Sequence, residues 1–251
     1  MLEKSYDKLK VKIYETREEM GNKAAKEAAK VLIDLLKKQD EVNVVLASAP
    51  SQDDFLDQLI GYKEIDWSRI NTFQMDEYIG LEIDNQNSFS SYLRETVFNK
   101  INTKNNYYMD GMKESEAECE RYEKLLKKHA IDVVFMGIGE NAHIAFNDPG
   151  IGKFNDPKMI KTVELDHMSR MQQVHDGRYK SLDEVPKKAI TLTIPTLISG
   201  KHIFCIVPTK NKASAVKKSL TSEITEDIPA SILRTVKNAV MYLDKEAASL
   251  L

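Results

Sequence analysis

The sequence predicts an α/β fold with one open, mainly parallel sheet covered by helices on both faces. Short apolar runs alternate along the chain with amphipathic stretches, which is typical of parallel strands buried on both faces. No internal repeat and no Pro/Gly/Ser-rich linker divides the chain, so we expect one domain over residues 1–251. The composition, 42% hydrophobic and 30% charged, is that of a globular chain long enough to bury a full core.

The first half of the chain alternates between helix and strand periods. Residues 22–38 place Ala and Leu side chains on one helical face with Lys and Glu opposite, which predicts an amphipathic helix. A buried strand is expected at Val44–Ala47, a helix from about Asp53 to Ile60, and a second strand over Ile70–Met75. Residues 113–129 predict a charged amphipathic helix.

The second half continues this alternation. The run IDVVFM at Ile131–Met136 predicts a third buried strand, Ala189–Ile194 a fourth and His202–Val207 a fifth. A helix over 210–220 and a strand over Ala239–Leu243 complete the series. These elements together favour the doubly wound arrangement.

Composition also excludes several classes of function. Lys+Arg minus Asp+Glu is 36 − 39 = −3, so nothing indicates a nucleic-acid partner. The charged N-terminus has no apolar core of a signal peptide, and no run approaches the ~20 apolar residues of a membrane span. We therefore expect a cytoplasmic protein with no membrane partner. Cys119 and Cys205 lack the spacing of a zinc site and are expected to be reduced thiols.

Four segments are expected to meet at one edge of the sheet. Ligands of open parallel sheets bind outside the carboxyl ends of the strands, which places 47–52, 76–81, 137–150 and 208–212 together. Glycine is scarce, with ten residues or about 4% against a usual ~7%. Four of the ten lie between 137 and 152, which marks that strand end for closer attention.

The segment after the third strand carries a candidate proton-transfer pair. Gly137 and Gly139 allow a tight turn and a close approach of the backbone to a ligand. His143 could transfer protons near neutral pH, and Asp148 could orient and charge-stabilise its imidazole. The alternative is that His143 is a structural histidine.

A second candidate group follows the second strand, where Asp76 and Glu77 stand at its apolar end. A carboxylate partly screened from water there can have a raised pKa and serve as a general base. The alternative is that either side chain only caps the next segment.

Two further segments have the features of a phosphate site. The loop from Ala47 leads into a helix start, which offers backbone N–H groups and a favourable dipole, and Ser48 and Ser51 could add hydroxyl donors. Lys210 and Lys212 open the helix after the fifth strand against its dipole, which a bound anion would explain. The alternatives are an ordinary N-cap at Ser51 and solvated lysines.

These segments together resemble the glucosamine-6-phosphate deaminase/isomerase family. QMDEYIGL at 74–81 and GIGENAHIAFNDPG at 137–150 match its MDEYxGL and GxGxDGHIAFNEP patterns in order and spacing. NKASAV at 211–216 resembles its phosphate-lysine helix start. The related 6-phosphogluconolactonases have a run closer to HTASLFP after the histidine, so HIAFN favours the deaminases.

The resemblance implies the family's doubly wound fold and a deaminating isomerase. The substrate would be an amino-sugar 6-phosphate, glucosamine or galactosamine 6-phosphate, and the products a ketohexose 6-phosphate and ammonia. Asp76 matches the carboxylate that moves a proton between C1 and C2, and His143 matches the residue that assists ring opening, with Asp148 in the place of its Glu partner. Lys212 and the loop 47–52, with Glu77, Gly137 and Gly139 nearby, would bind the substrate and its phosphate. The family's mechanism asks for no metal and no other cofactor.

The chain departs from the family pattern at several positions. The Asp-Gly before the histidine reads Asn141-Ala142, so Asp148 must supply the negative charge alone or with help from Glu140. The TGGTP-like phosphate loop reads ASAPSQ, without glycine. Arg170 and Arg178 are both candidates for the phosphate arginine. These departures indicate a divergent subgroup.

The departures also keep other functions open. A 6-phosphogluconolactonase-like lactonase, a sugar-phosphate isomerase without deamination, and a non-catalytic sugar-phosphate-binding protein would each suit the same scaffold. The family includes both monomers and larger assemblies, so a homo-oligomer stays open.

Overall fold

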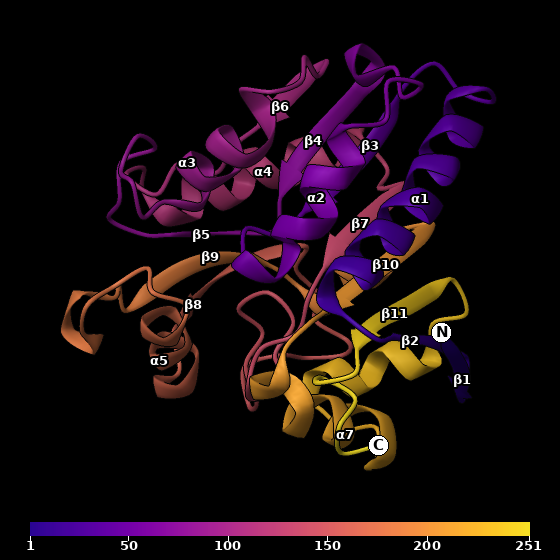
Figure 1. Ribbon diagram of the computed structural model, residues 1–251. Coiled ribbons are helices and arrows are strands. Elements are labelled where there is room, and N and C mark those ends of the chain that lie inside the picture. The colour runs from indigo at the N-terminus through magenta and orange to yellow at the C-terminus, as the bar shows by residue number, and fades with distance from the viewer.

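A single sheet of eight strands forms the centre of the molecule, which the computed structural model describes over residues 1–251 (Figure 1). Its order is β1-β2-β11-β10-β7-β3-β4-β6, and every neighbouring pair is parallel except β1 and β2. The strands are β1 Leu2–Tyr6, β2 Leu9–Tyr14, β3 Val42–Leu46, β4 Ile70–Gln74, β6 Asn105–Tyr107, β7 Val133–Met136, β10 His202–Val207 and β11 Ala239–Asp244.

Helices cover both faces of this sheet, as predicted. The residues of α1 (Arg17–Leu36) and α2 (Asp53–Ile60) share one apolar core with alternate residues of β3, β7 and β10. The residues of α4 (Ser115–Lys128) and α7 (Ala213–Thr221) share a second core with the other residues of the same strands. Because β3 and β7 are buried on both faces, their sequences are almost wholly apolar, which is why they could be identified.

A smaller antiparallel sheet packs against the second core. It has the order β5-β9-β8, with β5 at Asp76–Tyr78, β9 at Lys188–Leu192 and β8 at Ile160–Glu164. The predicted fourth strand is therefore present, but as β9 it belongs to this sheet and not to the parallel one. Three short helices accompany the smaller sheet and its connections: α3 Phe89–Leu93, α5 His167–His175 and α6 Ile194–Ile198. Because side chains of both sheets share one core, we propose that residues 1–251 form one domain.

Some elements begin elsewhere than the sequence predicts. The first helix starts at Arg17 because the Thr16 hydroxyl caps it, accepting from the Glu19 N–H at 3.1 Å. The hairpin of β1 and β2 was not predicted. The residues of β2 nevertheless alternate between buried and more exposed positions, which is typical of a strand with one face toward the core.

The order in which successive strands are added to the sheet reverses between β3 and β7, although the two strands are parallel. From β3 the chain moves outward through β4 and β6, and it then returns to β7 and continues outward on the other side through β10 and β11. The carboxyl ends of β3 and β7 therefore flank the point at which ligands bind in open α/β sheets.

Candidate active site

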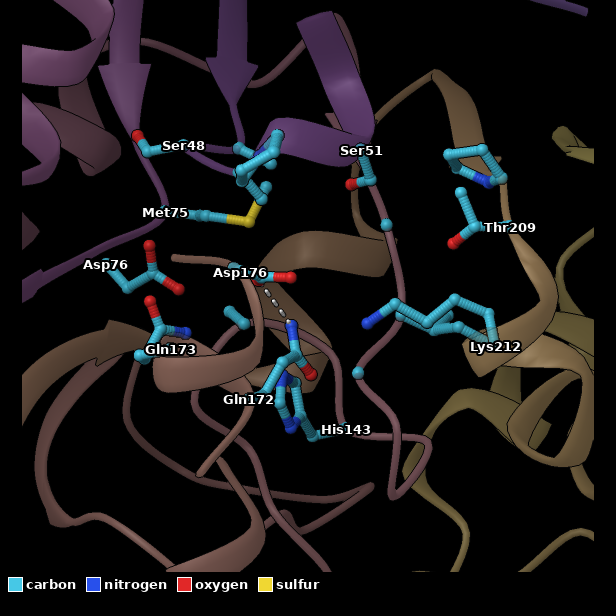
Figure 2. A pocket seen from close by; sticks show the side chains of 18 of the residues that line it. Ser48, Ser51, Met75, Asp76, His143, Gln172, Gln173, Asp176, Thr209 and Lys212 are labelled. Atoms are coloured by element: carbon cyan, nitrogen blue, oxygen red, sulfur yellow. Dashed lines mark hydrogen bonds between the residues drawn. The ribbon is translucent and has the colours of Figure 1, made fainter. Parts of the chain in front are cut away.

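A cavity of about 180 Å³ lies at this reversal point (Figure 2). It is bounded by the segments that follow β3, β7 and β10, by β5, and by α5. Eight of the residues that the sequence proposed for the site line it: Ala47, Ser48, Ser51, Asp76, Gly137, Gly139, His143 and Lys212. Asn141, Asp148, Glu77 and Arg170 do not line it.

Asp76 and Glu77 have different surroundings, although they are neighbours on β5. Successive side chains of a strand point to opposite faces, and only Asp76 lines the cavity. Glu77 accepts hydrogen bonds from the Phe89 and Ser90 N–H groups at 3.0 and 2.8 Å and from the Ser90 hydroxyl at 2.8 Å. Glu77 therefore caps the start of α3, whereas the Asp76 carboxylate accepts no hydrogen bond from the protein.

The environment of Asp76 favours its neutral form. Burial, and then the neighbouring charge of Glu77, raises the pKa of Asp76 to about 8, against a smaller opposing effect of Arg178. In Figure 2 the Gln173 amide points toward this carboxylate. A carboxylate with such a pKa is a strong enough base to take a proton from carbon next to a carbonyl.

The pH profile should report this carboxylate. If Asp76 must be ionised to act, kcat/KM is expected to rise about tenfold per pH unit from pH 6 and to level off near pH 8. Initial rates of ammonium release from glucosamine 6-phosphate between pH 6 and 9.5 would measure this. A rate that is flat from pH 6 upward would show that the base has an ordinary carboxyl pKa.

His143 is held between the glycine turn and a buried carboxylate. Its Nδ1 lies 3.1 Å from Asp148 Oδ1, and its backbone N–H donates to Asn141 Oδ1 at 3.1 Å. Asn141 also donates from Nδ2 to Asp148 Oδ1 at 3.0 Å. Burial alone would raise the pKa of Asp148, but its contacts with His143, Ser169 and Asn141 outweigh burial and lower that pKa to about 2. Asp148 is therefore a carboxylate at neutral pH, despite being fully buried.

Gly139 leaves the space that the imidazole occupies. A Cβ at this position would lie 2.2 Å from His143 Cε1 and 2.4 Å from Nε2. Since real Cβ atoms do not come so close to other atoms, Gly139→Ala must displace the ring. We expect kcat to fall roughly 100-fold, the loss that follows a misplacement of about 1 Å. The matched control is Gly61→Ala, because Gly61 ends α2 with an ordinary φ of −73°. Equal kcat values for the two variants would contradict this role of Gly139.

The backbone around the cavity is strained. Three of the four non-glycine residues with positive φ flank it: Ala142 (φ 67°), Ala145 (φ 49°) and Thr209 (φ 77°). Such conformations concentrate at functional sites, where the surrounding structure holds them. At Ala142 the conformation explains why the family pattern has glycine at this position.

Ala142→Gly is expected to stabilise the protein. Glycine removes the strain of the left-handed conformation, which is about 1–2 kcal/mol. Its greater conformational freedom in the unfolded chain offsets about half of this gain. The net gain in the free energy of unfolding is therefore about 1 kcal/mol, or roughly 2–4 °C in Tm. Thermal unfolding followed by circular dichroism would measure it. The control is Ala29→Gly inside helix α1, which should lower Tm. A lower Tm for Ala142→Gly as well would show that the backbone at Ala142 is not strained.

A lysine and two backbone N–H groups without a protein acceptor also border the cavity. Lys212 is 5% exposed, and its ammonium makes no ion pair or hydrogen bond with the protein. Burial lowers the pKa of Lys212, against opposing effects of Asp176 and Glu140. The N–H groups of Ser48 and Ala49 also have no protein acceptor. Ser51 does not cap α2, because the helix begins at Asp53 after a turn over Pro50–Gln52, and Figure 2 shows the Ser51 hydroxyl facing the cavity.

One arginine that the sequence did not single out also lines the cavity. Arg17, the first residue of α1, lines the cavity, contacts Asp54 and donates to the Pro50 carbonyl at 2.6 Å. Arg170 instead donates to the Leu182 and Val185 carbonyls, away from the cavity. An arginine at a helix start opposes the dipole in the same way as the lysines after β10, and this signal could have identified Arg17.

Arg178 also lies outside the cavity lining. Its guanidinium stacks over the rings of Phe89 and Tyr92, each with a centroid 5.3 Å away, and donates to the carbonyl of Asn87 at 3.2 Å. Its charge lowers the pKa of Asp76.

Helix α5 contributes residues that no motif indicated. Gln172, Gln173 and Asp176 line the cavity from this helix and its end. The Gln172 amide connects two parts of the site, accepting from the Glu140 N–H at 3.0 Å and donating to Asp176 at 3.4 Å (Figure 2). These polar side chains give the cavity wall hydrogen-bonding groups for hydroxyl or amino substituents of a ligand.

No three His, Cys, Asp or Glu side chains gather so that they could hold a metal ion. The helices are all too short or too polar to cross a membrane.

The comparisons with known proteins agree on one family. The model described as Glucosamine-6-phosphate isomerases/6-phosphogluconolactonase matches residues 15–242. The glucosamine-6-phosphate deaminase of Clostridium botulinum (strain Eklund 17B / Type B) is 40% identical over 193 residues, 75% of this chain and 76% of that protein. Glucosamine-6-phosphate deaminase 1 of Bacillus subtilis (strain 168) is 34% identical over 230 residues, 89% and 93% of the two chains.

Solved structures give the same result. A monomeric glucosamine-6-phosphate deaminase matches with a TM-score of 0.87 and 33% identity, over 96% of this chain and 99% of that one. A 6-phosphogluconolactonase from Thermotoga maritima matches with a TM-score of 0.77 over 94% and 99% of the chains, and at 20% identity it shows the shared fold.

Proposed function

This chain belongs to the family of glucosamine-6-phosphate isomerases and 6-phosphogluconolactonases, and from this premise we propose that it is a hexosamine-6-phosphate deaminating isomerase. The reaction converts an amino-sugar 6-phosphate and water to a ketohexose 6-phosphate and ammonia. One observation in the site supports it most directly: two proton-transfer groups, Asp76 and His143, share a cavity with the unpaired ammonium of Lys212.

The phosphate binds at the Lys212 end in this proposal. The ammonium of Lys212, the guanidinium of Arg17 and the free N–H groups of Ser48 and Ala49 supply charge and donors without glycine in the loop. Holding the phosphate there fixes C1 and C2 of the sugar at the other end, beside Asp76 and His143. Such positioning is itself a large part of catalysis.

Proton transfers complete the reaction. His143 takes the proton of the C1 hydroxyl and returns one to the ring oxygen, which opens the ring to the aldehyde. Asp76 then removes the C2 proton and delivers it to C1, while one proton of the amino group passes to the C1 oxygen, so that the open-chain amino aldose becomes a C2 imine with a C1 hydroxyl. Water adds to that imine, the C2–N bond breaks and ammonia leaves. The remaining product is the ketose 6-phosphate.

The substrate is glucosamine 6-phosphate or its C4 epimer, galactosamine 6-phosphate. The side chains that would distinguish them are Gln172, Gln173 and Asp176, which present both donors and acceptors to the cavity. A cytoplasmic location and an assembly of several copies stay predictions, which cell fractionation and light scattering would test.

Parallel assays with three substrates test the proposal. Purified protein should release ammonium from glucosamine 6-phosphate or galactosamine 6-phosphate and leave 6-phosphogluconolactone unhydrolysed above its spontaneous rate. Hydrolysis of the lactone alone would establish a lactonase. Thermal stabilisation by the amino sugars without any turnover would establish a binding protein.

A further inference from the structure

A serine of helix α5 lies between the two members of the His143–Asp148 pair. Ser169 is buried, and its Oγ lies 2.7 Å from His143 Nδ1, closer than the 3.1 Å that separates Nδ1 from Asp148 Oδ1. The same Oγ donates a hydrogen bond to Asp148 Oδ1. Neither Ser169 nor Asp148 lines the cavity, so both act on His143 from behind.

The direction of these hydrogen bonds is fixed by the number of protons available. A carboxylate only accepts, and a serine hydroxyl has one proton to donate. Since Ser169 gives its proton to Asp148, the short contact to His143 Nδ1 holds only if Nδ1 donates. The low pKa of Asp148, about 2, keeps that acceptor ionised at neutral pH.

We propose that Ser169 is a positioning residue, which links His143 Nδ1 to the Asp148 carboxylate through hydrogen bonds. This arrangement keeps a proton on Nδ1 and leaves Nε2 as the atom that exchanges protons with the substrate. His143 Nε2 has no hydrogen-bond partner in the protein, and the ring belongs to the cavity wall. The inference rests on the proposed function for the reaction that Nε2 serves. The assignment of the proton to Nδ1 does not depend on it.

The other neighbours of the carboxylate make Ser169 the main path to the ring. Asn141 donates to the same oxygen, Asp148 Oδ1, but its side chain contacts the backbone N–H of His143 and not the imidazole. Asp148 Oδ2 has no partner. Loss of the serine hydroxyl therefore leaves His143 with only the longer contact to Oδ1.

The position of Ser169 also connects this pair to the substrate-binding wall. Ser169 lies in the first turn of α5, which Asp166 caps by accepting from the Met168 N–H at 2.6 Å. The same helix presents Gln172 and Gln173 to the cavity one turn later. A shift of α5 would therefore change the seating of the substrate and the orientation of His143 together.

Kinetic measurements on Ser169→Ala and Ser169→Thr test the proposal. The alanine variant should lose roughly 10- to 100-fold in kcat, as is typical when an outer hydrogen bond of a functional group is removed. Its KM should stay within about threefold, because the phosphate end is untouched. Ser169→Thr retains the hydroxyl and should restore most of kcat. Wild-type kcat in the alanine variant, at wild-type Tm, would overturn the role.

A spectroscopic readout separates this inference from the proposed function. Nitrogen NMR of histidine-labelled, substrate-free protein, with His143 assigned by loss of its signals in His143→Gln, should show the proton on Nδ1 in the wild type. In Ser169→Ala the Nδ1 signal should shift measurably, because Nδ1 then has only the longer 3.1 Å contact to the Asp148 carboxylate. A wild-type ring protonated on Nε2 would overturn the inference, whatever substrate the enzyme takes. The expected signals without ammonium release from either sugar would leave it standing and reject the proposed reaction.

Discussion

Asp76→Asn is expected to lower kcat for ammonium release by about 10³-fold while substrate binding is largely retained. Asparagine has nearly the same shape but cannot accept the C2 proton, and positioned general bases contribute about 10²–10⁴-fold to rates. The proposed phosphate contact of Lys212 is unchanged, so the dissociation constant measured by calorimetry should move little. A near-wild-type kcat would show that another group is the base.

The same substitution should stabilise the protein in alkaline solution. The folded-state pKa of Asp76, about 8, lies above its unfolded value of ~3.9, so the folded protein holds an extra proton between these values. Stability contributed by this group therefore falls as pH rises from about 4 to 8. Asp76→Asn removes this loss, and its Tm should exceed that of the wild type by several degrees at pH 9 and by little at pH 4.

Glu77→Gln is the matched control, because it changes the adjacent carboxylate to an amide. Glu77 accepts hydrogen bonds from the N–H groups at the start of α3, and an amide nitrogen placed against those donors cannot replace it. We expect a lower free energy of unfolding, with turnover retained by the folded protein. If Glu77→Gln abolished turnover and Asp76→Asn did not, the roles of the two carboxylates would be exchanged.

The sequence predicted the parallel sheet well because that part of the fold is encoded locally. Strands such as β3 and β7 are continuous apolar runs, and their carboxyl ends necessarily meet at one edge, which is how Asp76, His143 and Lys212 could be grouped. The smaller sheet was harder to predict, because β5 is three residues long and its partner β9 lies more than a hundred residues away.

The site residues that could not be predicted depend on tertiary contacts. Ser169 lies 26 residues from His143 in the chain, on a helix that no motif marks, and only packing brings them to 2.7 Å. Arg170, its neighbour on α5, has the residue type expected at a phosphate site, but the helix turns it toward backbone carbonyls. Successive positions on a helix face different directions. Residue type alone therefore could not show that Ser169 faces the site and that Arg170 does not.

Lys212→Met is expected to raise KM for the sugar phosphate roughly 100-fold, with a smaller change in kcat. A buried ammonium that pairs with a phosphate contributes several kcal/mol to binding, and methionine keeps the length of the side chain without its charge. Lys210→Met is the matched control, because Lys210 lies two residues earlier, is exposed and is absent from the cavity wall. An equal rise in KM for both variants would mean that the lysines attract the substrate only through long-range electrostatics, without a direct contact of Lys212 with the phosphate.

Without ligand, Lys212→Met should be more stable than the wild type. Burial lowers the folded-state pKa of Lys212 below that of an unfolded lysine, ~10.4, so its charge opposes folding at every pH below the folded-state value. The gain in Tm should therefore be largest near neutral pH and should shrink as pH rises toward 10. Inorganic phosphate should raise Tm of the wild type but not of the variant, because only the wild type retains the ammonium that is proposed to bind the anion. Equal phosphate-induced shifts would place the phosphate elsewhere, whereas destabilisation by Lys212→Met would mean that the ammonium has a favourable partner within the folded protein.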